Sequence, residues 1–431
     1  MNMLISLKAR MAGPAALLLS VVLASGCATN PVTGESQLSL IGEGQEQQMG
    51  EENYRPTIQT QGGRFYLDPE LTDYVQEVGN KLAAVSDRPD LPYEFAVLNS
   101  SIPNAWALPA GKIAINRGLL VELEDEAQLA SVLGHEIVHA AARHSVQRMQ
   151  QGMLLSAGVA GLGMALSDNE WAGLLMGGAA VGSQLALAQY SQSNELEADR
   201  YGIEYMVEAG YDPEAAVELQ ELFLKLSEGQ NPGFLKGLFA THPPSQKRVE
   251  ANRRLAEKYG AEGYRGREVY QRKIAEAKRL QPAYELHNEA IQLANNKDYQ
   301  AALSKVNQAL KMAPNEAAFH ATRGQLHEAL DNPEKARENF DRAVELYPEM
   351  FSYRLLRGLN HLDAGRVDAA RADLEASAEV VPTGIAYLRL GDIAVSEGNR
   401  DRAAGYYQQV AQAGGQLGEE AQRKLSQLNQ R

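Results

Sequence analysis

The carboxyl-terminal third of the chain repeats itself every 34 residues. Three alanines and three prolines keep this spacing: Ala302, Ala336, Ala370, Pro314, Pro348 and Pro382. Gly324 and Gly358 keep it as well, and a fourth copy carries Gly391, slipped by one residue. Small residues at fixed positions let two helices pack closely, and a proline ends the second helix of each unit. From about Gln281 onward, the sequence therefore predicts a stack of helical hairpins.

This period and its repeated positions resemble tetratricopeptide repeats. The resemblance implies an all-α solenoid of about four repeats over residues 281–431, with a concave face for a peptide or a protein partner. No set of catalytic residues falls in this segment. We expect its four histidines to be surface residues or to line the groove: His287, His320, His327 and His361.

The first residues indicate a targeting segment. Lys8 and Arg10 precede an apolar run that ends at Ala24, and small residues then lead to Cys27. The pattern resembles the bacterial lipoprotein signal, which implies removal of residues 1–26 and lipidation of Cys27. The alternatives are an ordinary signal peptide and an uncleaved anchor, although the apolar run is short for a membrane span.

Cys27 is the only cysteine, so no disulfide can form within the chain. The next residue is alanine rather than aspartate, which by resemblance to the enterobacterial sorting rule favours the outer membrane. We therefore expect a periplasmic protein, lipid-anchored in the inner leaflet of the outer membrane. Residues 27–60 are rich in polar residues and glycine, and they are expected to form a mostly irregular tether with one short helix near Glu43 to Tyr54.

Between the tether and the repeats, the sequence predicts helices around a small sheet. Pro69 to Val85 has the spacing of an amphipathic helix, and Tyr93 to Leu98 alternates as a strand. Asn104 to Asn116 is typical of a hairpin that turns at residues 109–111. Its first strand, Asn104 to Leu108, either offers an edge to an extended peptide or only completes the core.

A possible metal-binding motif lies in His135-Glu136-Ile-Val-His139. The preceding Asp125 and Glu126 suit a helix N-terminus, and apolar residues recur around the motif at helical spacing. Residues four apart share one face of a helix, so His135 and His139 can offer two imidazole nitrogens to one metal ion. Glu136 lies beside them and could take a proton from water that the metal activates. The pattern also occurs by chance, so further support must come from elsewhere.

The third ligand has several candidates. In metzincins the third histidine follows the first by ten residues, but that position is Ser145 here, and Ala142 stands where glycine is needed. His144 is therefore expected to be a helix-end residue. Glu195 and Asp199 are better placed, because they lie four apart in a segment that Ser193 or Asn194 could cap. A carboxylate ligand and a carboxylate that orients a ligating histidine are often paired at zinc sites.

The combination of H-E-x-x-H with E-x-x-x-D some sixty residues later resembles the HtpX/BepA-like gluzincin metalloproteases, in the superfamily of the CAAX prenyl proteases. The resemblance covers about residues 27 to 260. It implies one zinc ion per chain with His135, His139 and Glu195 as ligands. It also implies that Glu136 is the general base and that Asp199 holds a ligating histidine in place. Other matching segments are Cys27-Ala-Thr-Asn-Pro-Val-Thr-Gly34, Asn104-Ala-Trp-Ala-Leu-Pro109, Gly118-Leu-Leu120 and Thr241-His-Pro243 with Arg248.

His242 and Arg248 follow in a segment where a helix is expected to begin after two prolines. His242 could stabilise an oxyanion, or it could occupy the fourth zinc position as a latch, as in similar proteases. A capping or packing role is the alternative. Arg248 is expected to pair with a carboxylate at the site rather than with substrate.

An apolar, glycine-rich segment from Gly152 to Ala188 separates the two metal motifs. Each arm is short for a membrane span. We expect either a helical hairpin or lid over the cleft, touching lipid or a partner, or a hairpin buried against its own domain.

These features predict a mainly α, α+β zincin-type protease domain at residues 61–262, a charged linking helix at 263–280 and the repeats. The predicted function is a zinc endopeptidase of the bacterial envelope. By resemblance, its substrates are misfolded or stalled outer-membrane or periplasmic proteins, and its partner is the barrel-assembly machinery. The alternative is an assembly chaperone or scaffold with a mostly latent protease site. The acidic chain, with a net charge of −14, is not expected to bind nucleic acid.

Overall fold

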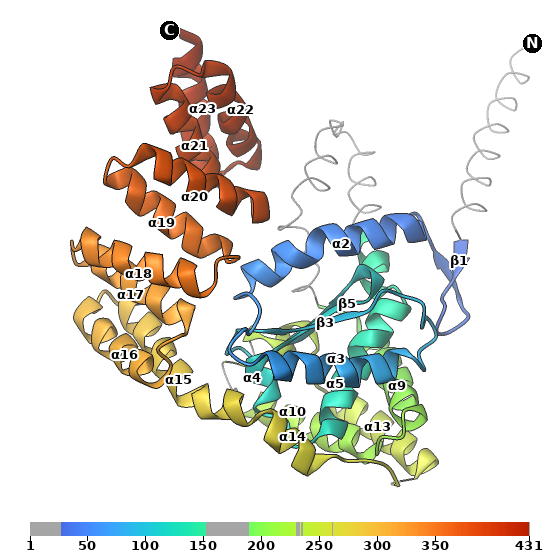
Figure 1. Cartoon of the computed structure of the whole chain (residues 1–431). Coiled ribbons are helices and arrows are strands. Elements are labelled where there is room, and N and C mark those ends of the chain that lie inside the picture. The colour runs from blue at the N-terminus through green and yellow to red at the C-terminus, as the bar shows by residue number, and fades with distance from the viewer. Residues whose placement is uncertain (1–26, 152–188, 230–232, 234–235, 261, 431) are drawn as a thin grey trace, which may run out of the picture.

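The computed structural model describes residues 27–151, 189–229, 233, 236–260 and 262–430 (Figure 1). The expected signal peptide at 1–26 and the expected hairpin at 152–188 lie outside the described residues. The fold class is confirmed: a helical domain with small sheets precedes an array of helical hairpins. Among the described residues, we find no helix with the length and apolar character needed to cross a membrane.

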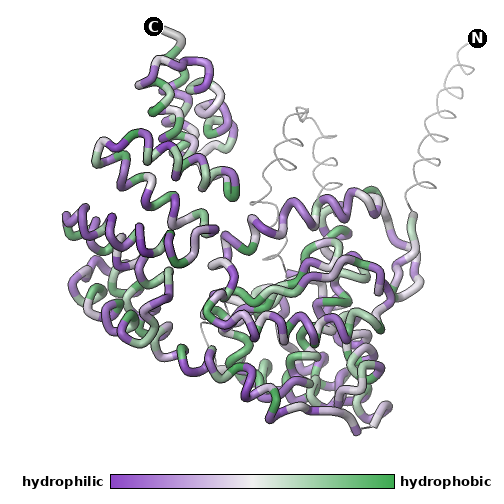
Figure 2. Tube along the Cα trace, viewed as in Figure 1, coloured by the Kyte–Doolittle hydropathy of each residue, from purple (hydrophilic) through white to green (hydrophobic). Residues whose placement is uncertain are grey.

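The prediction that residues 27–60 form a mostly irregular tether is wrong. Strands β1 (Cys27–Thr29) and β2 (Ser36–Leu38) form an antiparallel hairpin, and helix α2 (Glu43–Thr60) runs well beyond the short helix expected. Figure 2 shows α2 as mostly hydrophilic, which is why its composition suggests a linker. However, Tyr54 and Ile58 bury one face of α2 against the sheet.

The sheet of the protease-type domain has the order β3 (Glu94–Leu98), β5 (Lys112–Asn116), β4 (Ala105–Leu108). β3 and β5 are parallel, whereas β4 and β5 form the expected antiparallel hairpin through the short 3-10 turn Pro109–Gly111. Alternate residues face opposite layers, as a period of two requires. Ala96 and Trp106 pack towards α2, while Phe95 and Val97 join the larger core.

Helices lie on the other side of the sheet. They are α3 (Pro69–Ala83), α4 (Arg117–Leu120), α5 (Glu126–Ala141), α9 (Gln192–Glu208), α10 (Glu214–Glu228), α12 (Leu238–Thr241) and α13 (Gln246–Tyr259). Helices α3, α4 and α5 contact the strands, α9 and α10 pack on α5, and α13 packs on α9 and α10. The side chain of Asp125 caps α5 by accepting from the backbone nitrogen of Gln128. Ser191, rather than the expected Ser193 or Asn194, caps α9. These caps fix where the two helices of the metal motifs begin.

The repeats form four helical hairpins and a final helix, which confirms the tetratricopeptide prediction. The helices are α15 (Ala275–Asn295), α16 (Tyr299–Met312), α17 (Ala317–Ala329), α18 (Pro333–Leu346), α19 (Phe351–Asp363), α20 (Val367–Val380), α21 (Gly384–Ser396), α22 (Arg400–Ala413) and α23 (Gly415–Gln430). Gly324 and Gly358 lie where the two helices of a repeat approach most closely, against Phe340 and Leu374. Of the four histidines, His320 is buried rather than on the surface.

The repeat array packs on the protease-type domain instead of trailing from it (Figure 1). The linking segment contains helix α14 (Arg267–Lys273), whose Tyr270 is fully buried and donates a hydrogen bond to the carbonyl oxygen of Leu120. Tyr66 stacks on Tyr347 with ring centroids 4.9 Å apart. The two parts therefore share an interface, and the exact domain boundaries stay a prediction.

Candidate metal centre

The metal motifs meet where α5 crosses α9. The crossing is close because both helices carry glycine there: a Cβ on Gly202 would lie 3.0 Å from the backbone nitrogen of His135, beside Gly134. Small residues at a crossing let two helix backbones approach. As a result, His135 and His139 on α5 face Glu195 and Asp199 on α9.

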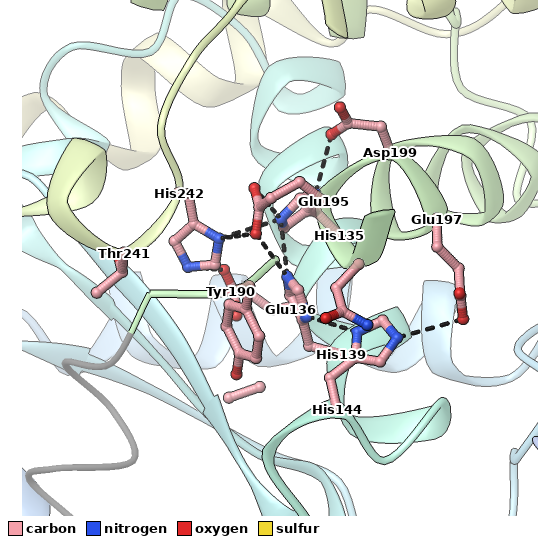
Figure 3. A network of polar contacts seen from close by, with 12 residues as sticks. His135, Glu136, His139, His144, Tyr190, Glu195, Glu197, Asp199, Thr241 and His242 are labelled. Carbon is pink, nitrogen blue, oxygen red and sulfur yellow. Dashed lines mark hydrogen bonds and ion pairs between the residues drawn. The ribbon is translucent and has the colours of Figure 1, made fainter. Parts of the chain in front are cut away.

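Four side chains converge at this crossing: His135, His139, Glu195 and His242 (Figure 3). One donor atom from each lies within 4.8 Å of the others. The Nε2 atoms of His135 and His139 are 3.0 Å apart, and they lie 3.5 and 3.4 Å from the two oxygens of Glu195. Nδ1 of His242 lies 3.2 Å from Nε2 of His135 and 3.0 Å from Oε1 of Glu195.

These separations fit zinc. Ligand distances of about 2.0–2.1 Å in a tetrahedral site place neighbouring ligand atoms about 3.3–3.4 Å apart. The nearest donor atoms are 3.0–3.5 Å apart, close to that edge length, when both oxygens of Glu195 are counted; one donor atom from each residue lies within 4.8 Å of the others. Imidazole and carboxylate donors in a buried site also suit zinc better than calcium or magnesium, which prefer oxygen ligands alone.

Asp199 and Arg248 lie directly behind the cluster. Oδ1 of Asp199 is 3.0 Å from Nδ1 of His135. Arg248 donates to both oxygens of Asp199 at 2.7 Å and pairs with Oε2 of Glu195 at 2.7 Å. All these side chains are buried or nearly so. Burial alone would raise the pKa of Asp199, but the guanidinium of Arg248 outweighs it and lowers that pKa.

The surroundings of the cluster shift the pKa values of the two α5 histidines in opposite directions. Burial would lower the pKa of His135, but Glu195 and Asp199 outweigh burial and raise it to about 10. His139 is more deeply enclosed, and burial lowers its pKa well below the usual value. Burial also raises the pKa of Glu136, which suits a group that exchanges protons near neutral pH.

Glu136 faces a small cavity of about 30 Å³ beside the cluster, together with His135 and His242. Oε2 of Glu136 is buried and has no hydrogen-bond partner among the described residues. Apolar side chains, among them Val132 and Phe223, and polar ones, among them Ser131 and Gln220, line the rest of the cavity. The cavity is large enough for about one water molecule.

Two contacts of the cluster were not predicted from the sequence. Tyr190 stacks on the ring of His139, with centroids 3.8 Å apart and planes inclined by 17°. His144, expected as a helix-end residue, is not among the four converging donors, but it is buried against His139. Tyr190 precedes its helix without any recurring pattern, so only the tertiary structure reveals its position.

Strand β4 lies at an edge of the described sheet. The backbone bond from the nitrogen of Asn116 to the carbonyl of Asn104 fixes the register, so the backbone groups of Ala105 and Ala107 point away from β5. The carbonyl oxygen of Ala107 accepts from the hydroxyl of Ser145 at 3.2 Å. β4 therefore lies at the edge of the described sheet, and its role as an edge for a peptide rather than as part of the core stays a prediction.

A zincin-like crossing of two metal-motif helices beside a small sheet, followed by helical repeats, defines a metallopeptidase domain joined to a tetratricopeptide array. Comparison with known proteins agrees. Residues 69–256 match peptidase family M48, and residues 287–351 and 355–417 match the tetratricopeptide repeat family. The chain thus carries an M48 peptidase domain and carboxyl-terminal tetratricopeptide repeats.

Several curated proteins resemble the peptidase half. The Beta-barrel assembly-enhancing protease of Escherichia coli (strain K12) is 30% identical over 234 residues, which cover 53% of this chain and 47% of that protein. Its counterpart in Yersinia pestis is 32% identical over 52% of this chain and 47% of its own length. The Mitochondrial metalloendopeptidase OMA1 of Schizosaccharomyces pombe is 32% identical over 51% of this chain and 63% of its own. The matched region spans about half the length of the first two relatives.

Proposed function

We propose that the chain is a zinc-dependent endopeptidase in which His135, His139 and Glu195 hold one zinc ion. The observation that carries the proposal is the set of donor separations of 3.0–3.5 Å, which suits the edges of a zinc tetrahedron. When bound, zinc supplies the Lewis acidity that activates water and polarises a peptide carbonyl.

Glu136 acts as the general base. Glu136 lines the cavity and its Oε2 atom has no hydrogen-bond partner among the described residues, so its carboxylate can accept a proton from the attacking water and pass it to the leaving amine. The raised pKa of its carboxyl group supports this return of the proton. Asp199 accepts from Nδ1 of His135, and Arg248 holds Asp199 and Glu195 in place.

Substrate binds as an extended peptide along β4. The backbone groups of Ala105 and Ala107 point away from β5, in the direction in which a peptide could add a further strand. Both residues are at most 1% exposed and the Ala107 carbonyl accepts from Ser145, so the chain that covers β4 has to move before a peptide can pair there. This recognition reads backbone hydrogen bonds rather than side chains, which favours unfolded segments over folded proteins. Changing β4 itself would disturb the core, because all four of its residues are buried.

His242 serves as a latch on the fourth zinc position. Its Nδ1 atom lies 3.2 Å from Nε2 of His135 and 3.0 Å from Oε1 of Glu195, close enough for it to act as a fourth ligand beside the other three. The same observation favours a second candidate function, an assembly chaperone or scaffold whose protease site is latent most of the time. A His242→Ala variant separates the latch from an oxyanion role: the latch predicts faster cleavage of an unfolded peptide, whereas loss of cleavage would favour oxyanion stabilisation.

The substrates proposed are misfolded or stalled outer-membrane proteins, and the proposed partner of the repeats is the barrel-assembly machinery. The relatives' name, with its reference to β-barrel assembly, supports both. We also propose that the protein is periplasmic and held in the inner leaflet of the outer membrane by lipid on Cys27. The position of Cys27 after an apolar segment and small residues supports this.

The test compares the parent with Glu136→Gln, which keeps the side chain's shape but removes the base. Purified parent should degrade a urea-unfolded outer-membrane β-barrel protein, and Glu136→Gln should bind zinc without degrading it. The same variant, used as a trap in envelope extracts, should retain the natural substrates. If both forms rescue an envelope defect equally and neither degrades the unfolded protein, the scaffold function replaces the protease function.

A further inference from the structure

A line of polar contacts leads from the metal cluster to the amino-terminal hairpin. Nδ1 of His139 lies 2.8 Å from Nδ1 of His144, and Nε2 of His144 lies 3.2 Å from Oε1 of Glu197. The same oxygen accepts from Nδ2 of Asn30 at 3.3 Å, across 167 residues of sequence. Figure 3 shows His144 between His139 and Glu197, on the side of His139 away from His242.

The contacts determine where the protons lie once Nε2 of His139 is used for a metal. His139 must then carry its proton on Nδ1 and donate it to Nδ1 of His144. His144 must in turn carry its proton on Nε2 and donate it to the carboxylate of Glu197, which can only accept. Each donor has one acceptor, so the tautomer and the ring orientation of His139 are both fixed from behind.

The hairpin holds Asn30 in a defined orientation. Its Oδ1 atom accepts from the backbone nitrogens of Val32 and Thr33 at 2.9 and 3.3 Å, which directs Nδ2 towards Glu197. Asn30 is itself buried. The chain after the hairpin is tied to the end of the metal helix by Arg143, which donates to the carbonyl oxygen of Ile41 at 2.6 Å.

We propose that His144 and Glu197 are positioning residues for the metal ligand His139, and that the amino-terminal hairpin supports them through Asn30. The inference rests on the proposed function, because it takes His139 as a zinc ligand. Burial of two imidazoles in contact is costly unless their nitrogens are paired, and here each of the four is either paired or directed to the metal cluster. Zinc affinity should thus depend on a segment remote in sequence.

The test measures zinc affinity by competition with a chromophoric chelator, and the absorption spectrum of the cobalt-substituted full-length protein. His144→Leu removes the acceptor for His139 and should weaken zinc binding about 10–100-fold. His144→Asn places an amide oxygen near the position of Nδ1, so it should restore most of the lost affinity. Asn30→Asp keeps the turn but sets a carboxylate against Glu197, and it should weaken zinc binding about threefold.

Matched measurements separate positioning from packing. Leucine and asparagine have the same number of side-chain heavy atoms and the same branching, so a purely structural role would lower the melting temperature of both metal-free proteins and spare zinc affinity. The control His327→Leu, in the repeats, should leave zinc affinity and the cobalt spectrum unchanged. The proposal is overturned if His144→Leu binds zinc like the parent, or if His144→Asn and His144→Leu lose affinity equally. A parent that binds no zinc would refute the proposed function, and this inference with it.

Discussion

The crossing of α5 and α9 should tolerate no added methyl group. A Cβ on Gly202 would lie 3.0 Å from the backbone nitrogen of His135 and 3.1 Å from the carbonyl carbon of Gly134. Atoms at rest are about 3.5 Å apart or more. Both neighbours are helix backbone and cannot rotate away, so Gly202→Ala should push the helices apart by roughly 0.5 Å.

That displacement matters more for the metal site than for stability. Metal–ligand distances tolerate only about 0.2 Å, so Gly202→Ala should weaken zinc binding about tenfold or more, by analogy with outer-shell mutations. The cost of overpacking, about 1–3 kcal/mol, is partly offset by the roughly 1 kcal/mol by which alanine favours a helix over glycine. The variant should therefore fold, with a net loss of about 0–2 kcal/mol.

The assay is chelator competition for zinc, run beside thermal unfolding of the metal-free protein. Gly405→Ala is the matched control, because Gly405 is exposed in α22 and its Cβ would meet no described atom within 4 Å. The control should keep the parent's zinc affinity and gain slightly in stability. Zinc affinity of Gly202→Ala equal to that of the parent would refute the claim that close backbone approach builds the metal site.

Three further changes test other parts of the structure. Arg248→Met removes the guanidinium from two buried carboxylates, Asp199 and Glu195, so it should destabilise the metal-free protein by about 3–5 kcal/mol in urea unfolding; an unchanged midpoint would contradict this. Burial, with a smaller effect of Arg117, lowers the pKa of His287 from 6.5 to about 4. The free energy of unfolding therefore suffers no loss from His287 above pH 6.5, where the histidine is neutral in both states. It should fall by up to about 3 kcal/mol as the pH drops to 4. His287→Asn should flatten this dependence, and an equally steep profile in the variant would count against it. Tyr66→Phe loses the hydroxyl's two hydrogen bonds to the repeats, so limited proteolysis should release the repeat domain faster, with about 1 kcal/mol lost; identical cleavage rates would disprove the contact's role.

Local patterns explain what the sequence could predict. The spacing of His135 and His139, and of Glu195 and Asp199, requires only a helix, and both helices carry strong caps. The hairpin of β4 and β5 follows from alternation around a proline–glycine turn. The repeats follow from a period that several small residues keep together.

Contacts between distant segments explain what the sequence could not predict. The sequence of helix α2 suggests a tether because its residues are polar and Pro56 suggests a break in the helix. It continues through Pro56 because its buried residues gain partners from elsewhere: Glu46, only 1% exposed, pairs with Arg88 at 3.0 Å and Arg143 at 2.8 Å. No local sequence pattern predicts such ion pairs.

The same reason applies at the metal cluster. His144 lies five residues from His139, yet its role depends on Glu197 and Asn30, which arrive from other elements. Tyr190 stacks on His139 only because the chain returns there before α9.

The central claim is that one zinc ion is held by His135, His139 and Glu195. X-ray absorption of the zinc-loaded protein tests it most directly. We expect one zinc per chain, with nitrogen and oxygen ligands at about 2.0–2.1 Å and the outer scattering of imidazole. His135→Ala and Glu195→Gln should each lose or rearrange that ligand shell. A protein that retains no zinc, or a spectrum that both substitutions leave unchanged, would contradict it.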